Sequence, residues 1–270
     1  MIVSPLTLVG FQLHAWRRGL GNFALFYHRD CAGHLLSMHQ SGTHWLKFML
    51  ANALSYQYGT PAPAYNHAND IIGGPRDAVV YPQLPRLIAS HSIAPAVLAH
   101  AAVHRWFALP RYVVLVRDVR AALMSNYLKW RQRYGVSFSD YLRGDIAGRR
   151  YNSDLWWALR FLNAWGEVVQ HVPARVAVVR YEDLERDAAR ELTRVATHFA
   201  LALAPVAIAH GAASADKAAM QARDDPARPP GAVRIDDREP SYSDDDRAFV
   251  TAVCARCLRH PFGYDYRVWP

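Results

Sequence analysis

Length, composition and charge narrow the classes of protein to which this chain can belong. Its 270 residues suffice for one large α/β domain, and 51% hydrophobic against 20% charged residues allow a sizeable core and exclude wholesale disorder. The 31 lysines and arginines against 23 acidic residues give a formal charge of +8, which suits an anionic ligand, a nucleic acid or an acidic membrane surface. Because no basic run is interleaved with aromatic residues, we expect no nucleic-acid partner.

The N-terminal segment, residues 1–32, opens with an apolar stretch over residues 1–16, which is interrupted by Pro5, Gln12 and His14 and followed by Arg17 and Arg18, and no basic residue precedes this stretch. It fits neither a signal peptide nor a bilayer span. We expect it to pack on the rest of the chain. An amphipathic element in peripheral contact with a membrane is the alternative.

The three cysteines are too few for a disulfide framework and favour a reducing, cytoplasmic location. Cys254 and Cys257 have the CxxC spacing, but they fall within a helical pattern and lack a second ligand pair. We therefore interpret them as packing residues and expect no metal site.

Short apolar runs alternate with helical patterns along the chain. We predict strands at residues 35–38, 87–89, 112–116 and 176–179. We predict helices from about Thr43, after Pro95, over residues 122–130, from an N-cap at Ser153 or Asp154, over about 187–199, and from Asp244. This order predicts a single α/β domain spanning residues 1–270, with a parallel sheet wrapped by helices. Residues 222–243, rich in proline and charge, are predicted to form a long loop or lid.

The clearest functional signal is the segment from Leu35 to Lys47. An apolar strand runs into Gln40-Ser-Gly-Thr43, and a helix begins at once. Gly42 allows the backbone to approach a ligand closely, and the helix amino end presents free N–H groups, so this segment predicts a cradle for phosphate or sulfate. It is not the nucleotide-binding GxxxxGK[ST] loop, because Thr43 and His44 stand where that motif needs lysine and serine or threonine. An ordinary strand–turn–helix is the alternative for the segment by itself.

Three motifs in chain order resemble the sulfotransferases that use 3′-phosphoadenosine 5′-phosphosulfate (PAPS). His39-Gln-Ser-Gly-Thr-His-Trp-Leu46 is similar to their 5′-phosphosulfate loop. Val113-Val-Leu-Val-Arg-Asp118, with Ser125 eight positions after Arg117, is similar to their 3′-phosphate motif. Val178-Val-Arg-Tyr-Glu-Asp-Leu184 resembles a third signature, and Phe262-Gly-Tyr264 a fourth. The resemblance spans roughly residues 33–265. It implies a P-loop-like sulfotransferase fold that transfers sulfonate from PAPS to a hydroxyl, releases PAP and needs no metal.

The resemblance also implies a role for each matching residue. The loop would hold the 5′-phosphosulfate with its backbone and with the hydroxyls of Ser41 and Thr43. Arg117 and Ser125 would bind the 3′-phosphate. The remaining residues of the expected nucleotide site are Gln40, Gly42, His44, Trp45 beside the adenine, Tyr181, and Arg228 and Arg234 of a blurred C-terminal motif. The alternatives are core packing for Trp45 and a surface ion pair with Asp118 or Glu182 for Arg117.

His91, which follows a predicted strand, is the candidate base for the acceptor hydroxyl. Two departures from the family affect the catalytic prediction. Gln40 replaces a loop lysine, and Ala89 replaces the lysine two positions before the base. Losing such a donor to the leaving oxygen can cost on the order of 10²–10³ in rate. His44 is therefore a second catalytic candidate, whereas Lys47 is expected to point outward.

Several alternatives remain open at this level. The missing lysines also fit a catalytically silent PAP-binding protein, and a nucleotide kinase is a weaker alternative because the loop lysine is absent. A carbohydrate acceptor is slightly preferred over a phenolic or lipid one. The reason is a group of aromatic residues that can stack on sugar faces but serve core packing equally well: Tyr127, Trp130, Tyr134, Trp156 and Trp157.

Overall fold

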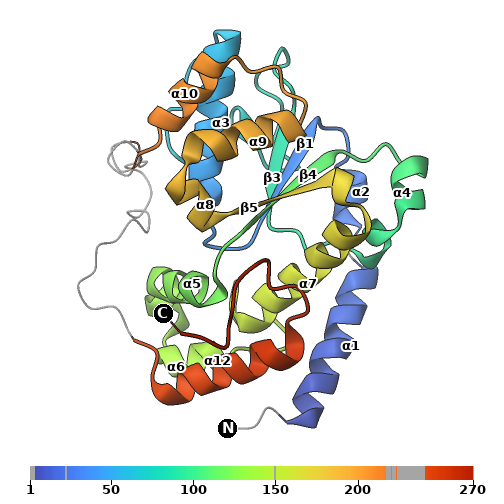
Figure 1. The fold of residues 1–270 in the computed structure, drawn as a ribbon, viewed down its shortest axis with the longest axis vertical. Helices are drawn as coiled ribbons and strands as arrows, with labels where there is room; N and C mark the ends of the chain where they lie inside the picture. Colours follow the sequence, from blue (N-terminus) through green and yellow to red (C-terminus); the bar gives the residue numbers. More distant parts are fainter. Residues whose placement is uncertain are drawn as a thin grey trace.

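The computed structural model describes residues 4–21, 23–148, 150–216, 220, 223 and 241–269. At the centre of this part of the chain lies a five-stranded parallel sheet with the strand order β2-β3-β1-β4-β5 (Figure 1). The strands are β1 (Gly33–Ser37), β2 (Ile72–Gly73), β3 (Leu87–Ser90), β4 (Arg111–Val116) and β5 (Val176–Arg180). The predicted parallel sheet is confirmed. The one strand that was not predicted, β2, is too short to show a hydrophobic pattern.

Helices connect the strands and cover both faces of the sheet. They are α1 (Pro5–Gly21), α2 (Ala24–Tyr27), α3 (Thr43–Tyr58), α4 (Ala101–Trp106), α5 (Val119–Tyr134), α6 (Phe138–Arg143), α7 (Leu155–His171), α8 (Tyr181–Arg186), α9 (Ala188–His198), α10 (Pro205–Ala213) and α12 (Asp244–Cys257), with 3₁₀ turns η1 (Ala96–Ala99) and η2 (Pro173–Arg175). Asp154 caps α7 as predicted, accepting the Trp157 N–H at 2.8 Å. The last helix is capped by Ser243.

Side chains alternate between two cores along the central strand β4. Val113 and Leu115 belong to the core that α3, α8, α9 and α10 cover. Tyr112 and Val114 belong to the opposite core, built with α1, α5, α6, α7 and α12. Figure 1 shows the first set of helices above the sheet and the second set below it. Because β4 is buried on both faces, its sequence is a continuous apolar run.

The two central strands send their following helices to opposite faces. After β1, α3 packs in the upper core; after the neighbouring β4, α5 packs in the lower core. Such a divergence leaves a crevice at the carboxyl ends of the two strands, where α/β proteins bind their ligands. The fold therefore places the predicted phosphate loop and Arg117 at the same switch point.

The N-terminal segment forms helix α1, which packs on the lower layer. Phe11 is 1% exposed, and its ring lies 5.5 Å from that of Trp156. Phe11 thus fixes helix α1 on the lower layer. None of the helices in the described ranges is long and apolar enough to cross a membrane. Most of the predicted loop or lid at 222–243 lies outside the described residues.

Candidate functional site

Four predicted site residues each follow the end of a strand. Gln40 lies in the loop after β1, His91 follows β3, Arg117 follows β4, and Tyr181 begins α8 directly after β5. Because the strands are parallel, their carboxyl ends share one edge of the sheet. The structure therefore brings together residues that are up to 141 positions apart in the chain.

The loop from Met38 to Gly42 turns sharply through two left-handed residues. Gln40 has φ 61° and Gly42 has φ 89°. A Cβ on Gly42 would lie 2.7 Å from Cδ2 of Tyr181, so the turn requires glycine both for its conformation and for the close approach. No side chain caps the amino end of α3, which leaves its first N–H groups free to bind an anion.

The hydroxyls of Ser41 and Thr43 are engaged inside the protein. Ser41 Oγ donates to the carbonyl of Met38 at 2.5 Å and lies 3.2 Å from that of Leu115. Thr43 Oγ1 donates to Ser37 Oγ at 2.8 Å. The expectation that both hydroxyls point towards a ligand does not match this geometry. The groups left free to donate are instead the backbone N–H groups of residues 43–45 at the start of α3.

Arg117 is held by the loop and by an aromatic face. Its Nη1 donates to the carbonyl of Gln40 at 3.1 Å, and its guanidinium carbon lies 4.0 Å from the centre of the Tyr181 ring. Its buried Nε has no hydrogen-bond partner. The ion pair considered as an alternative is not formed, because Asp118 pairs with Arg120 at 2.6 Å. A buried guanidinium donor without a partner is costly and matches an anionic ligand.

Ser125 lies on the second turn of α5 and faces the same loop. Its Oγ is 3.5 Å from Oε1 of Gln40, a long contact. Gln40 therefore lies between the two residues of the predicted 3′-phosphate motif, with its carbonyl at Arg117 and its side-chain amide at Ser125.

His91 is oriented by Ser37 at the end of β1. Its Nδ1 lies 2.8 Å from the Ser37 carbonyl oxygen and 3.1 Å from Ser37 Oγ. A carbonyl oxygen only accepts, so Nδ1 carries the proton and Nε2 keeps the free lone pair. Burial lowers the pKa of His91, although part of the ring remains accessible to solvent. The imidazole is therefore neutral at pH 7 and able to accept a proton through Nε2.

Two further histidines stand beside His91. The ring of His39 stacks on it with centroids 3.9 Å apart and also contacts Trp157 at 4.5 Å. Burial, followed by the charges of His91 and Lys129, lowers the pKa of His39 to about 3. Burial, followed by the charges of Lys47 and Lys129, lowers the pKa of His44 to about 4. All three imidazoles are neutral at pH 7, and Lys129 carries the positive charge close to them.

Lys129 was not predicted from the sequence. It lies four residues after Ser125, on the same face of α5 and one turn further along the helix. Its charge lowers the pKa of His39, His44 and His91, and its side chain is exposed. The four-residue spacing from Ser125 was the signal in the sequence that could have identified it.

Lys47 does not point outward, so that expectation is wrong. It is 5% exposed, and its Nζ donates to Oδ1 of Asn69. Burial lowers the pKa of Lys47 to about 8, opposed by the charges of Asp77 and Asp70. The lysine thus serves the packing of residues 69–77 on α3.

The remaining predicted residues fall in different places. Trp45 is half-buried, donates from Nε1 to the carbonyl of Ala215 at 2.6 Å, and meets the Tyr181 ring edge-on at 5.8 Å. Glu182 of the third motif accepts the N–H of Asp118, in the second motif, at 3.2 Å and the hydroxyl of Tyr264, in the fourth. These two hydrogen bonds link the three motifs. Arg228 and Arg234 lie outside the described residues.

The two cysteines with the CxxC spacing lie on one helix of the described part of the chain. Cys254 and Cys257 are buried on α12, and burial raises the pKa of the Cys254 thiol to about 12. Within the described ranges, no three His, Cys, Asp or Glu side chains are grouped closely enough to hold a metal ion.

Comparisons with known proteins bear on the family and on the fold. Residues 93–205 match the model of the sulfotransferase family. The crystal structure of mouse sulfotransferase SULT7A1 complexed with PAP is 16% identical in sequence, with a TM-score of 0.56 over 90% of each chain. A sulfotransferase from Alicyclobacillus acidocaldarius is 12% identical, with a TM-score of 0.47 over 84% of this chain and 92% of its own. No curated protein sequence gives a significant match. The similarity to the mouse enzyme establishes a shared fold.

Proposed function

We propose that this member of the sulfotransferase family transfers a sulfonate group from PAPS to a hydroxyl acceptor. The observation that carries the proposal is the partnerless, buried Nε of Arg117. It lies at the sheet edge where the uncapped amino end of α3 also begins. Two groups suited to anions therefore flank one crevice, as a nucleotide with phosphates at both ends of its adenosine requires.

The residues present fit such a nucleotide. The N–H groups at the start of α3 would hold the 5′ end, and Gly42 leaves room for close approach. Arg117 and Ser125 would hold the 3′-phosphate by displacing the contacts both now make with Gln40. Trp45 and Tyr181 supply aromatic surfaces for the adenine. Arg228 and Arg234 remain part of the proposed site.

PAPS supplies an activated sulfonate whose sulfur–oxygen bond breaks as the acceptor oxygen attacks. His91 Nε2 takes the proton of the acceptor hydroxyl, while Nδ1 holds the ring through Ser37. Negative charge grows on the oxygen that leaves with PAP. Among the described residues, Lys129 is our candidate for the cation that replaces the family lysines at Gln40 and Ala89, because its charge already reaches all three histidines.

For the acceptor, we propose a carbohydrate. Trp157 supports this choice, since it lies against His39, which in turn stacks on the candidate base. Its aromatic surface could bind a sugar face close to His91. Trp156 does not support it, because it is 2% exposed and belongs to the core. Tyr127 and Tyr134 do not support a carbohydrate acceptor either, because their rings pack on Tyr141.

Calorimetric titration with PAP, ATP and adenosine 5′-phosphosulfate tests the proposal. We expect PAP to bind more tightly than ATP. Arg117→Ala should weaken PAP binding about ten- to a hundred-fold and the binding of adenosine 5′-phosphosulfate much less, because only PAP carries the 3′-phosphate. Arg111→Ala is the matched control, since Arg111 begins the same strand at its opposite end.

Three outcomes would change the proposal. Equal losses for both nucleotides in Arg117→Ala would refute the assignment of Arg117 to the 3′-phosphate. PAP binding without sulfonate transfer to any hydroxyl acceptor would favour the silent nucleotide-binding protein. ATP bound in preference to PAP would favour a kinase.

A further inference from the structure

The molecule also has a hollow whose lining includes none of the residues proposed to bind the nucleotide. It is a cavity of about 490 Å³ between α1, α7 and η1. Its walls are mainly apolar and include Phe11, Ala15, Ile93, Ala94 and Val168. This volume is in the range of pockets that hold small organic ligands. The wall composition requires that most of the ligand be apolar.

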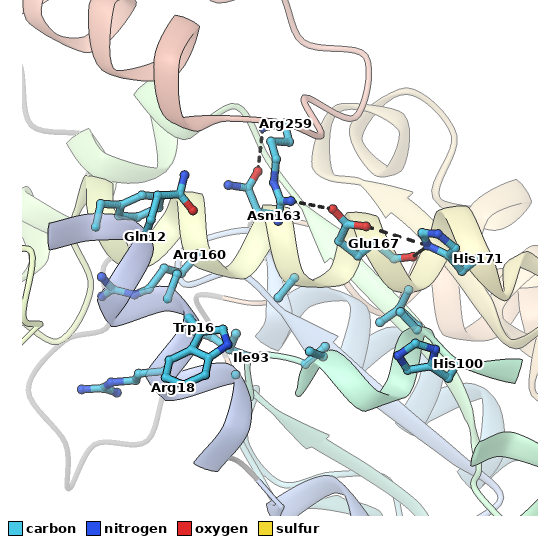
Figure 2. Close-up of a pocket in the computed structure, with 18 residues that line it drawn as sticks. Gln12, Trp16, Arg18, Ile93, His100, Arg160, Asn163, Glu167, His171 and Arg259 are labelled. Carbon is cyan, nitrogen blue, oxygen red and sulfur yellow. Dashed lines mark hydrogen bonds and ion pairs between the residues drawn. The ribbon is translucent and has the colours of Figure 1, made fainter. Parts of the chain in front are cut away.

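Charged or ionisable side chains lie at both ends of the cavity. Figure 2 shows Arg18, Trp16 and Arg160 at one end and His100 and His171 at the other. Near His171, Glu167 pairs with Arg259 at 2.9 Å and with His260 at 3.3 Å. The charge at that end is therefore compensated within the protein.

The charge of Arg160 is not compensated in this way. The residue is 3% exposed, its Nη1 donates to the carbonyl of Ile146 at 2.8 Å, and its Nε and Nη2 have no hydrogen-bond partner. No described carboxylate forms an ion pair with it. Burial lowers the pKa of Arg160, and the charges of Asp154 and Asp145, neither of which forms an ion pair with it, oppose this. An isolated buried guanidinium destabilises a protein unless an anion joins it.

A second guanidinium points to the same place. A Cβ on Gly148 would lie 3.0 Å from Arg160 Nη2 and 3.9 Å from Arg18 Nη2. His14 also lies nearby, because the charges of Arg160 and Arg18 add to burial in lowering the pKa of His14. Like charges are thus gathered beside Gly148 at one end of an apolar cavity.

We propose that this cavity binds an amphipathic anion. Its aliphatic chain would lie among the apolar walls, and its phosphate or carboxylate head would contact Arg18 and Arg160. The site is separate from the proposed nucleotide site and does not depend on the proposed sulfonate transfer. A single anionic head can accept from both guanidiniums and would satisfy the two donors that Arg160 leaves free.

The outer face of α1 indicates how such a ligand can reach the cavity. Leu6, Val9, Leu13 and Trp16 form one stripe of the helix and are 84%, 56%, 62% and 67% exposed. Trp16 also lines the cavity. The stripe is therefore continuous with the mouth of the site, and an exposed apolar helix face is suited to a lipid surface.

Calorimetry on the full chain with decyl phosphate, below its micelle concentration, tests the proposal. We expect one bound molecule per chain, with inorganic phosphate and the neutral decyl maltoside each binding far more weakly. Arg18→Ala and Arg160→Met should each weaken decyl phosphate binding about ten- to a hundred-fold. Arg17→Ala is the matched control, because Arg17 is exposed on the same helix and does not line the cavity. PAP binding should be unchanged in all three variants.

Thermal unfolding separates a binding role of Arg160 from a structural one. Arg160→Met removes an uncompensated buried charge, so the midpoint should stay constant or rise while decyl phosphate binding is lost. A lower midpoint with decyl phosphate binding retained would overturn the proposal. So would equal binding of decyl maltoside and decyl phosphate, or an Arg17→Ala effect as large as that of Arg18→Ala.

Flotation with phosphatidylcholine vesicles, with and without phosphatidic acid, distinguishes the two sources of the ligand. A lipid surface is the source if the vesicles with phosphatidic acid bind the protein and Leu13→Glu abolishes this while leaving decyl phosphate binding intact. A soluble amphiphile is the source if decyl phosphate binds but neither kind of vesicle does.

Discussion

The imidazole of His91 is the group whose protonation state should control the rate. We expect His91→Ala to lower sulfonate transfer about 10²–10⁴-fold and to leave PAP affinity within a few-fold. Burial lowers the pKa of His91, so the ring remains a free base down to a pH below its ordinary value of 6.5. The wild-type rate should accordingly fall only as the pH drops through that lowered pKa. A pH profile of turnover measures this acidic limb.

His44→Ala is the comparison for this experiment. His44 flanks the loop but lacks the contact with Ser37 that orients His91. If His44 only stabilises the leaving oxygen, its loss should reduce the rate and preserve the acidic limb. Near wild-type turnover in His91→Ala would show that another group is the base.

Lys129→Met should reduce the maximal rate about 10²-fold and hardly change PAP affinity, since the charge acts on the oxygen that leaves. It should also shift the acidic limb towards higher pH, because the charge of Lys129 helps to lower the pKa of His91. Arg133→Met is the matched control, because Lys129 and Arg133 both lie over the ring of Trp130, at 5.5 Å and 5.8 Å respectively. Identical behaviour of the two variants would remove Lys129 from the mechanism.

Individual side chains show where inference from sequence stops. The motifs predicted that Gln40, Arg117 and Ser125 belong to one site, and in the structure Gln40 contacts both of the others. They could not reveal that the Ser41 hydroxyl turns back to the Met38 carbonyl, or that Lys47 is buried against Asn69. Both facts depend on segments distant in the chain, and no local pattern encodes them.

At the scale of elements, periodicity was informative where an element is long or buried on both faces. It predicted β4 and the capped start of α7. It predicted α9 from about residue 187, but it missed α8, because a helix of six residues is too short to show a helical period. Periodicity also left α1 unassigned, because apolar residues occur on more than one side of that helix and weaken its amphipathic pattern.

The turn between β1 and α3 should control both PAP affinity and the stability of the fold through Gly42. Gly42→Ala should lower PAP affinity at least ten-fold, because its Cβ would displace the Tyr181 ring that supports Arg117. It should also destabilise the fold by about 1–3 kcal/mol through the left-handed backbone. Gly135→Ala is the control: its φ is 61°, yet nothing lies within 4 Å of the added carbon. The control should lose stability but keep its PAP affinity, as chemical denaturation and calorimetry would show.

At the scale of the molecule, the sheet separates two cores, and the proposed nucleotide site lies at their junction. The loop before α3 leads into the upper core, whereas Ser125 and Lys129 belong to α5 in the lower layer. The cavity proposed for an amphipathic anion lies entirely within the lower layer, between α1, α7 and η1. A nucleotide bound at the strand ends therefore contacts elements of both layers, and an amphiphile in the cavity contacts one.

This difference leads to a prediction for thermal unfolding. A ligand that binds only the folded state stabilises it by about 2.7 kcal/mol at a hundred-fold excess over its dissociation constant. For a chain of this size, PAP should then raise the unfolding midpoint on the order of 5–10 °C. Because the nucleotide spans both layers, the whole chain should still unfold in one transition. ATP at the same concentration should give a much smaller shift, and Arg117→Ala should abolish most of the effect of PAP. A second transition that PAP leaves in place would show that the lower layer unfolds independently of the proposed nucleotide site.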